Sequence, residues 1–272
     1  MERLALRRPH VHVDVMVARK LLEADRIYHH HEHRAATMGE STSEQKVGAP
    51  AAAKSSVGIH AGLSLWLQPS ASHSPTTMST LHALMGDLRR SVEEQGADTA
   101  PAFEPHATLL SGLTCISPEK VCTGVDCVLS AFRAELRQHP KKQEPFHIPV
   151  QAPATRGTFF QCVLLPLIPT NSLLALNEAM RKEFNQEHQP TYFPHVSLLY
   201  ADIGADGAKQ QIDRLEHDGW FSPAPASESG ASRIGQARAN TFESINLVTL
   251  SLWDTNGPVQ DWSKLREWTL PR

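Results

Sequence analysis

FEPHATLLSGL (residues 103–113) and FPHVSLLYADI (residues 193–203) are two copies of one short pattern. Each copy reads Pro-His-x-hydroxyl-Leu-Leu, and the histidine and hydroxyl positions are held by His106, Thr108, His195 and Ser197. In a β-strand, side chains at i and i+2 point to the same face, so each copy would present an imidazole beside a hydroxyl. The apolar residues between them take the opposite face and can pack against helices.

Strand-like and amphipathic helical runs alternate on both sides of these copies. The further expected strands are residues 62–68, 146–152, 159–168 and 245–253. The expected helices are residues 77–92, 118–137, 172–187 and 206–217, with Pro118 in a first helical position and Asn171 as an N-cap. The strand connections are too irregular for a doubly wound parallel sheet, so the pattern predicts an α+β fold with antiparallel sheets.

Composition divides the 272 residues into two parts. Residues 37–56 are rich in Ala, Ser and Gly and carry few large apolar side chains, which is typical of a linker. We therefore expect a largely disordered N-terminal extension over residues 1–57 and a folded domain over residues 58–272. A polar, small-residue stretch at 222–239 is expected to be a long loop.

Charge, hydropathy and cysteine spacing exclude several classes of protein. A formal net charge of −3 and a pI near 6.6 argue against a broad basic surface for long nucleic acid. No run approaches the roughly 18 to 20 apolar residues of a membrane span. The four cysteines include no C-x-x-C pair, which favours free thiols in a reducing compartment. We expect an intracellular, cytoplasmic protein without a membrane span.

A histidine-rich run, His29-His30-His31-Glu32-His33, contains residue types that bind metals. On a helix, His29 and His33 would share a face. No cysteine or acidic partner set with the spacing of a closed site accompanies them, so a solvated run is the favoured interpretation. The alternative is a metal-dependent phosphodiesterase, which sensitivity to chelators would distinguish.

Two matched histidines suit phosphodiester hydrolysis if the copies face one another across a cleft. One neutral imidazole can take a proton from water while the other, protonated, gives its proton to the departing oxygen. The unperturbed pKa of histidine, about 6.5, lies near working pH for both tasks. Thr108 and Ser197 could donate hydrogen bonds to the non-bridging oxygens. A single His-x-hydroxyl motif would more often be a hydrogen-bonded structural histidine, but two copies in one frame favour a site.

SLWLQP (residues 64–69) and the two copies follow one another along the chain in the order found in a known family. They resemble the motifs of the two-histidine phosphoesterases, and among these the fungal and plant 2',3'-cyclic nucleotide phosphodiesterases. The resemblance implies a bilobal fold, with two antiparallel sheets lining a central cleft and helices outside. It implies that His106 and His195 are catalytic and that Thr108 and Ser197 bind substrate. It also implies that neither a metal nor a cofactor is needed.

The resemblance further implies that Trp66 and Tyr200 line the substrate pocket. For Trp66, core packing is an equal alternative. Tyr200 lies five residues after His195, so regular alternation would turn it away from the cleft unless the strand twists or ends first. Core packing is therefore the slightly favoured interpretation for Tyr200.

The implied activity is hydrolysis of nucleoside 2',3'-cyclic phosphates to 2'-phosphates, with ADP-ribose 1'',2''-cyclic phosphate from tRNA splicing as a possible second substrate. The family's usual assignment makes His195 the base. The partner is then a small cyclic nucleotide, with no stable nucleic-acid complex, and the protein a monomer. Relatives also suggest association with internal membranes such as the Golgi. Alternatives are an RNA-end processing phosphodiesterase and a non-catalytic module that binds RNA or cyclic phosphate.

Overall fold

The computed structural model describes residues 59–70, 72, 74–96, 100–138, 146–222, 231–235 and 241–271. These residues belong to one unit, Lys54–Arg272. The expected disordered extension and the histidine run at residues 29–33 lie outside the described residues. Within them, no helix is long and apolar enough to cross a membrane.

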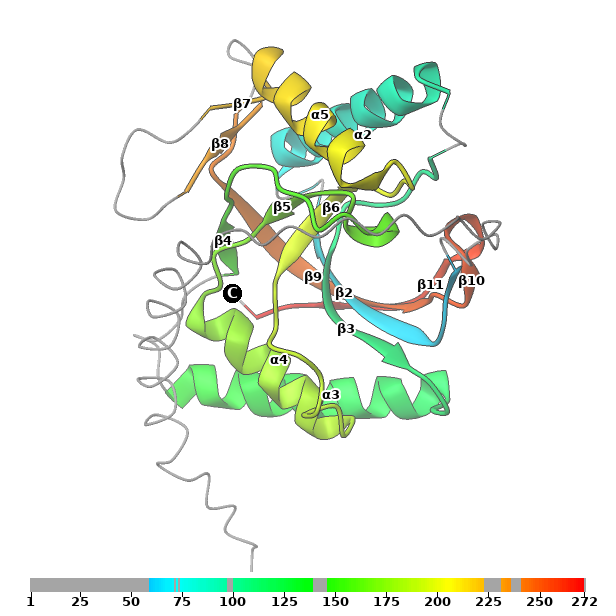
Figure 1. Cartoon of the computed structure of the whole chain (residues 1–272). Helices are drawn as coiled ribbons and strands as arrows, with labels where there is room; N and C mark the ends of the chain where they lie inside the picture. The colour runs from blue at the N-terminus through cyan, green and yellow to red at the C-terminus, as the bar shows by residue number, and fades with distance from the viewer. Residues whose placement is uncertain are drawn as a thin grey trace, which may run out of the picture. The chain divides into compact units, whose positions relative to one another are not determined.

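The centre of the unit is a seven-stranded sheet in which every registered pairing is antiparallel. The strand order is β11-β9-β2-β3-β6-β5, and β4 pairs with β9 outside this path. The strands are β2 (Leu63–Pro69), β3 (Ala107–Leu113), β4 (His147–Pro149), β5 (Val163–Pro166), β6 (His195–Leu199), β9 (Ser244–Asp254) and β11 (Ser263–Thr269). The antiparallel α+β fold predicted from the sequence is confirmed (Figure 1).

The two copies of the motif form β3 and β6, which are neighbours in this sheet. Their one registered pair is Ala107 with Val196, whereas β2 pairs with β9 along its whole length. The two separate sheets expected from the resemblance are thus joined into one. The junction is a narrow strip of backbone pairing because the strands meet only at the residues that follow the two histidines.

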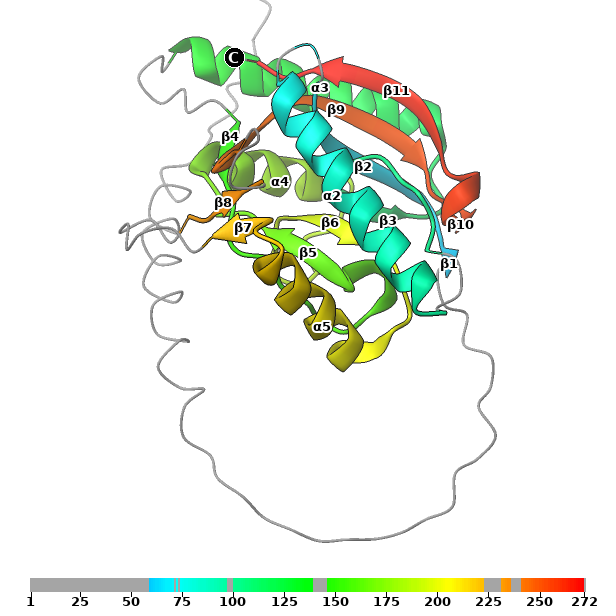
Figure 2. The ribbon, with the colours of Figure 1, turned by 90° about the horizontal axis from the view of Figure 1, so that it is seen from above.

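Four helices are described, and they lie in two pairs with the sheet between them (Figures 1 and 2). One pair is α2 (Pro75–Glu94) and α5 (Gly204–His217); the other is α3 (Pro118–Gln138) and α4 (Asn171–Glu183). α2 buries Leu81, Leu84, Leu88 and Val92, a spacing that places them on one helical face. The four helices expected from the sequence are confirmed. α4, however, is capped by the Thr170 hydroxyl, which accepts from the Leu173 N–H at 3.3 Å, and Asn171 is its first helical residue.

Short elements complete the unit and correct two expectations. β1 (Ile59–His60) pairs with β10 (Gly257–Pro258), and β7 (Phe221–Ser222) pairs with β8 (Arg233–Ile234), so a strand interrupts the loop expected at 222–239. Residues Phe159–Gln161 form the 3-10 helix η2 rather than the start of a strand. η3 is Val259–Asp261, and it precedes the unpredicted strand β11.

Candidate active site

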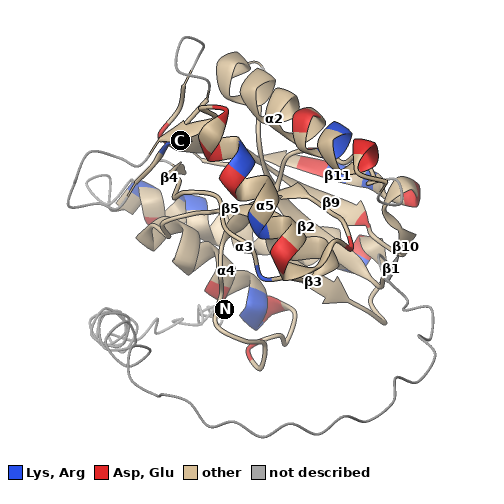
Figure 3. Cartoon of the chain, turned by 45° about the horizontal axis from the view of Figure 1, so that its top comes forward, with Lys and Arg blue, Asp and Glu red and all other residues tan. Residues whose placement is uncertain are grey.

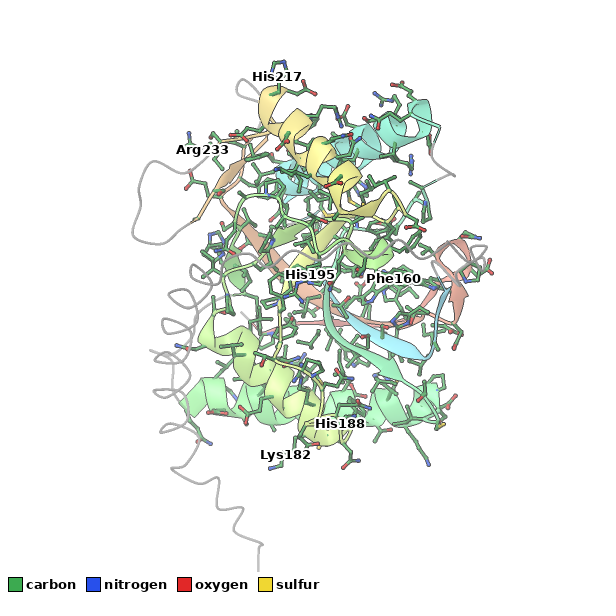
Figure 4. The ribbon with its side chains drawn as sticks, in the orientation of Figure 1. Phe160, Lys182, His188, His195, His217 and Arg233 are labelled. Carbon is green, nitrogen blue, oxygen red and sulfur yellow. The ribbon has the colours of Figure 1, made fainter. Side chains whose placement is uncertain are left out.

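The single pairing between β3 and β6 brings the two motif histidines together. His106 directly precedes β3, His195 is the first residue of β6, and the paired residues Ala107 and Val196 follow them. Figure 4 shows His195 and Phe160 between the α2–α5 pair and the α3–α4 pair. Burial is the main cause of the low pKa of His106, and the positive charge that His195 carries when protonated lowers it further.

Both imidazoles are held in the same way. Nδ1 of His106 lies 2.7 Å from the carbonyl oxygen of Glu104, and Nδ1 of His195 lies 2.9 Å from that of Phe193. A carbonyl oxygen only accepts, so each Nδ1 carries the proton and donates. The neutral ring therefore leaves Nε2 unprotonated, which is the form that a general base requires.

The two histidines differ in burial. His106 is 3% exposed, and burial, reinforced by the charge of His195, lowers its pKa from 6.5 to about 3 despite its bond to the Glu104 carbonyl. His195 is only partly buried; burial lowers its pKa, the Phe193 carbonyl raises it, and the positive charge of Arg156 lowers it. Both imidazoles are therefore mainly neutral at pH 7 in the free protein.

The two hydroxyls of the motif are not equivalent. Thr108 is partly buried and lies opposite Trp66 in the β2–β3 register, and its hydroxyl bonds to no other group in the described part of the chain. Ser197 is buried, and its Oγ donates to the carbonyl oxygen of Phe160 at 3.0 Å. Thr108 is thus free to donate to an anion, whereas Ser197 has to exchange its present bond for a new one.

Trp66 packs directly against His106. The two rings are stacked, with centroids 3.6 Å apart and an interplanar angle of 7°, and Trp66 also stacks on Trp253 at 4.3 Å. Only 2% of Trp66 is exposed. This contact fixes the plane of the imidazole and places Trp66 beside the site as a wall of the His106 ring.

Tyr200 lies close to the site residues. β6 ends one residue before it, at Leu199, so strand alternation no longer sets the direction of its side chain. Its ring stacks on Phe103 with centroids 3.8 Å apart. Burial raises the pKa of Tyr200 well above its usual value, so the phenol stays protonated.

A cavity of about 420 Å³ is lined by residues that contact His106, but neither His106 nor His195 lines it. It shares Trp66 and Phe103 with the surroundings of His106 and is also bordered by Trp253, Trp262, His82 and Arg89. A cavity of this size, with aromatic walls and a few polar groups at its border, fits a small organic ligand.

Sequence reasoning missed four residues close to these groups: His60, Arg156, Phe160 and Trp262. His60 meets the rings of Phe160 and Trp262 edge-on, with centroids 5.8 and 5.9 Å away. Phe160 also stacks on Trp262 at 5.9 Å. Each comes from a short or irregular segment, where neither hydrophobic periodicity nor a motif indicates which way a side chain points.

The described ranges contain no group of three or more His, Cys, Asp or Glu side chains placed to hold a metal ion.

Comparisons of this chain with known proteins agree on one family. A family model described as "Cyclic phosphodiesterase-like protein" matches residues 61–270. The cyclic phosphodiesterase of Arabidopsis thaliana is 27% identical over 153 residues, covering 56% of this chain and 71% of the relative. The 2',3'-cyclic-nucleotide 3'-phosphodiesterase of Kluyveromyces lactis is 26% identical over 219 residues, covering 77% of this chain and 99% of the relative.

Among solved structures, the crystal structure of E. coli LigT in apo form covers 79% of this chain and 99% of its own, at 13% identity and a TM-score of 0.40. That likeness is too low to bear on the site. The family match, which spans most of the chain, confirms the resemblance seen in the sequence and the predicted enzyme class, a phosphoric diester hydrolase. The chain belongs to the cyclic phosphodiesterase-like protein family.

Proposed function

We propose that this protein hydrolyses nucleoside 2',3'-cyclic phosphates to nucleoside 2'-phosphates without a metal ion. The observation that carries the proposal is the pairing of Ala107 with Val196, which sets two identically held histidines beside each other in a chain of this family. The names of the Arabidopsis and Kluyveromyces relatives support a cyclic phosphodiester as the substrate class.

The reaction needs one base and one acid. Nε2 of the base takes a proton from water as the water oxygen bonds to phosphorus, and the bond from phosphorus to the 3' oxygen breaks. The acid gives its Nε2 proton to that oxygen, which leaves as the 3' hydroxyl. Proton exchange with solvent then restores the two imidazoles.

Exposure supports His195 as the base. Water can reach a partly buried imidazole more readily than one that is 3% exposed, as His106 is. His106 is then the acid, and it has to gain its proton in the complex with the anionic substrate. The face of Trp66 favours that protonated form, because an aromatic ring attracts a cation stacked on it.

The hydroxyls and the cavity complete the proposed complex. Thr108 donates to one non-bridging oxygen at once, and Ser197 turns from the Phe160 carbonyl to donate to another. The cavity beside Trp66 and Phe103 receives the nucleoside, since its aromatic walls can stack on a base. ADP-ribose 1'',2''-cyclic phosphate contains the same five-membered cyclic phosphate, and we propose it as a second substrate.

Phosphorus NMR of 2',3'-cyclic AMP with the purified protein in excess EDTA tests the proposal. The expected product is 2'-AMP, formed at a rate that added Mg²⁺ or Zn²⁺ does not raise. ADP-ribose 1'',2''-cyclic phosphate is assayed in parallel. Formation of 3'-AMP, turnover only after a metal is added, or no turnover of either compound would contradict the proposal.

A further inference from the structure

The strands that carry the candidate site supply no positive charge of their own. β2, β3 and β6 contain no Lys, Arg, Asp or Glu, and Figure 3 shows the charged residues mainly on helices and turns. A site for a phosphodiester anion on such strands gains from a cation brought in by another segment. Arg156 lies in the segment between β4 and η2, and its charge acts on His195.

Arg156 is connected to His195 through one aromatic ring. Its guanidinium carbon lies 3.9 Å from the centroid of the Phe193 ring, a cation–π contact. The Phe193 ring stacks on the His195 ring with centroids 5.3 Å apart, and the Phe193 carbonyl accepts from Nδ1 of His195. Arg156 therefore contacts the residue that orients His195.

The backbone around Arg156 is tied in place. The N–H of Arg156 donates to the carbonyl of Gln161 at 3.0 Å, which joins this segment to η2. The N–H of Gly157 donates to the Thr155 hydroxyl at 2.9 Å, and Gly157 has a φ of +67°, which glycine adopts without strain. The position of Arg156 is thus set by hydrogen bonds on both sides.

Arg156 has no carboxylate partner among the residues that the structure describes. Arg214, Arg233 and Arg266, by contrast, each pair with an Asp or Glu at 2.8–2.9 Å. No acidic group in the described part of the chain neutralises the guanidinium, which is exposed to solvent, and its positive charge adds to burial, the larger cause, in lowering the pKa of His195. Of the charged groups on neighbouring segments, Arg156 acts on the pKa of His195, and His195 in turn acts on the pKa of His106.

We infer that Arg156 is a positioning residue of this enzyme, which acts through Phe193 to hold His195 as the base. The inference rests on the proposed function, since it assigns the state of one of the two proposed histidines. The positive charge opposes a second positive charge on His195, and the contact with Phe193 steadies the carbonyl that sets its tautomer.

Proton NMR titration of His195 in the full chain tests the electrostatic part without any substrate. Arg156→Gln should raise the pKa of His195, because the cation that opposes its protonation is gone. Arg156→Lys should leave it close to the wild-type value, since it keeps the charge. Arg90, an exposed arginine on α2, supplies the matched control, and Arg90→Gln should leave the titration unchanged. An unchanged titration of His195 in Arg156→Gln would overturn the inference.

The kinetic part uses 2',3'-cyclic AMP between pH 8 and pH 5.5. The loss of kcat/KM in Arg156→Gln should grow by a factor of about 3 to 10 as the pH falls, because the more basic His195 is lost to protonation. Arg156→Lys should restore most of the lost activity. A loss that stays constant with pH, or a gain, contradicts the inference. If wild type is inactive at every pH, the proposed function fails, while the titration still reports on Arg156.

Discussion

His106 is a basic side chain in an apolar setting, 3% exposed and stacked on Trp66. The folded chain holds its pKa at about 3, against the ordinary 6.5. Between these pH values the unfolded chain binds a proton that the folded chain does not. His106 therefore leaves the free energy of unfolding unaffected above pH 6.5 and lowers it as the pH falls towards 3.

His106→Gln should remove this part of the acid sensitivity. The free energy of unfolding of wild type should fall relative to the variant by about 1.4 kcal/mol per pH unit below pH 6.5. Urea unfolding at several pH values between 7 and 4 measures the difference, in which the other titrating groups cancel. Parallel pH dependences of the two proteins would mean that His106 titrates normally and is not sealed from water.

At this scale the sequence predicts residues that sit in a repeated pattern and misses those that do not. His106, Thr108, His195 and Ser197 follow from strand alternation within the duplicated motif, and the β3–β6 pairing brings the copies together. Arg156 and Trp262 reach the same region from irregular segments, whose directions depend on tertiary contacts such as the Arg156–Phe193 stack. Local propensity contains no information about such contacts.

At the scale of elements, alanine substitutions at two helical glycines are expected to have opposite effects on stability. A methyl group at Gly124 on α3 would lie 2.9 Å from the ring of Phe184, so α3 and the end of α4 approach too closely for alanine. A methyl group at Gly86 on α2 meets no atom within 4 Å. Gly124→Ala should destabilise the protein by about 1–2 kcal/mol, because overpacking outweighs the gain in helix propensity.

Gly86→Ala should stabilise the protein by about 0.5–1 kcal/mol, because it lowers the backbone entropy of the unfolded chain and adds no clash. Chemical denaturation of both variants, with unchanged m values, makes the comparison. Equal effects at the two positions would contradict the close α3–α4 packing.

The elements themselves were largely predictable where burial imposes a period. The stripe on α2 and the apolar alternation in β3 follow the core directly. β11 was missed because six of its seven residues are exposed and Trp268 is the only buried one. The strand forms through its backbone ladder with β9, which leaves no hydrophobic pattern in the sequence. The joining of two expected sheets at Ala107 and Val196 likewise depends on one backbone pairing.

For the whole molecule, the described site groups lie between His60 and Trp262, and the family match begins at residue 61. A protein that starts at Lys54 should therefore keep the kcat/KM of the full chain in EDTA, with the same temperature of unfolding for the domain. The same truncation removes the histidine run at 29–33. Loss of activity on truncation, or restoration of activity by zinc only in the full chain, would favour the metal-dependent alternative.

The central claim is that His106 and His195 act as one acid–base pair. The most direct test is kcat/KM for 2',3'-cyclic AMP in EDTA with His106→Ala, His195→Ala and the double variant, and with His188→Ala as the control. His188 is exposed and lies at the periphery, away from His195 (Figure 4). Each single variant should lose a factor on the order of 10² to 10⁴, the double variant little more, and the control nothing. Near wild-type activity in either single variant, or losses that multiply in the double variant, would contradict the paired mechanism.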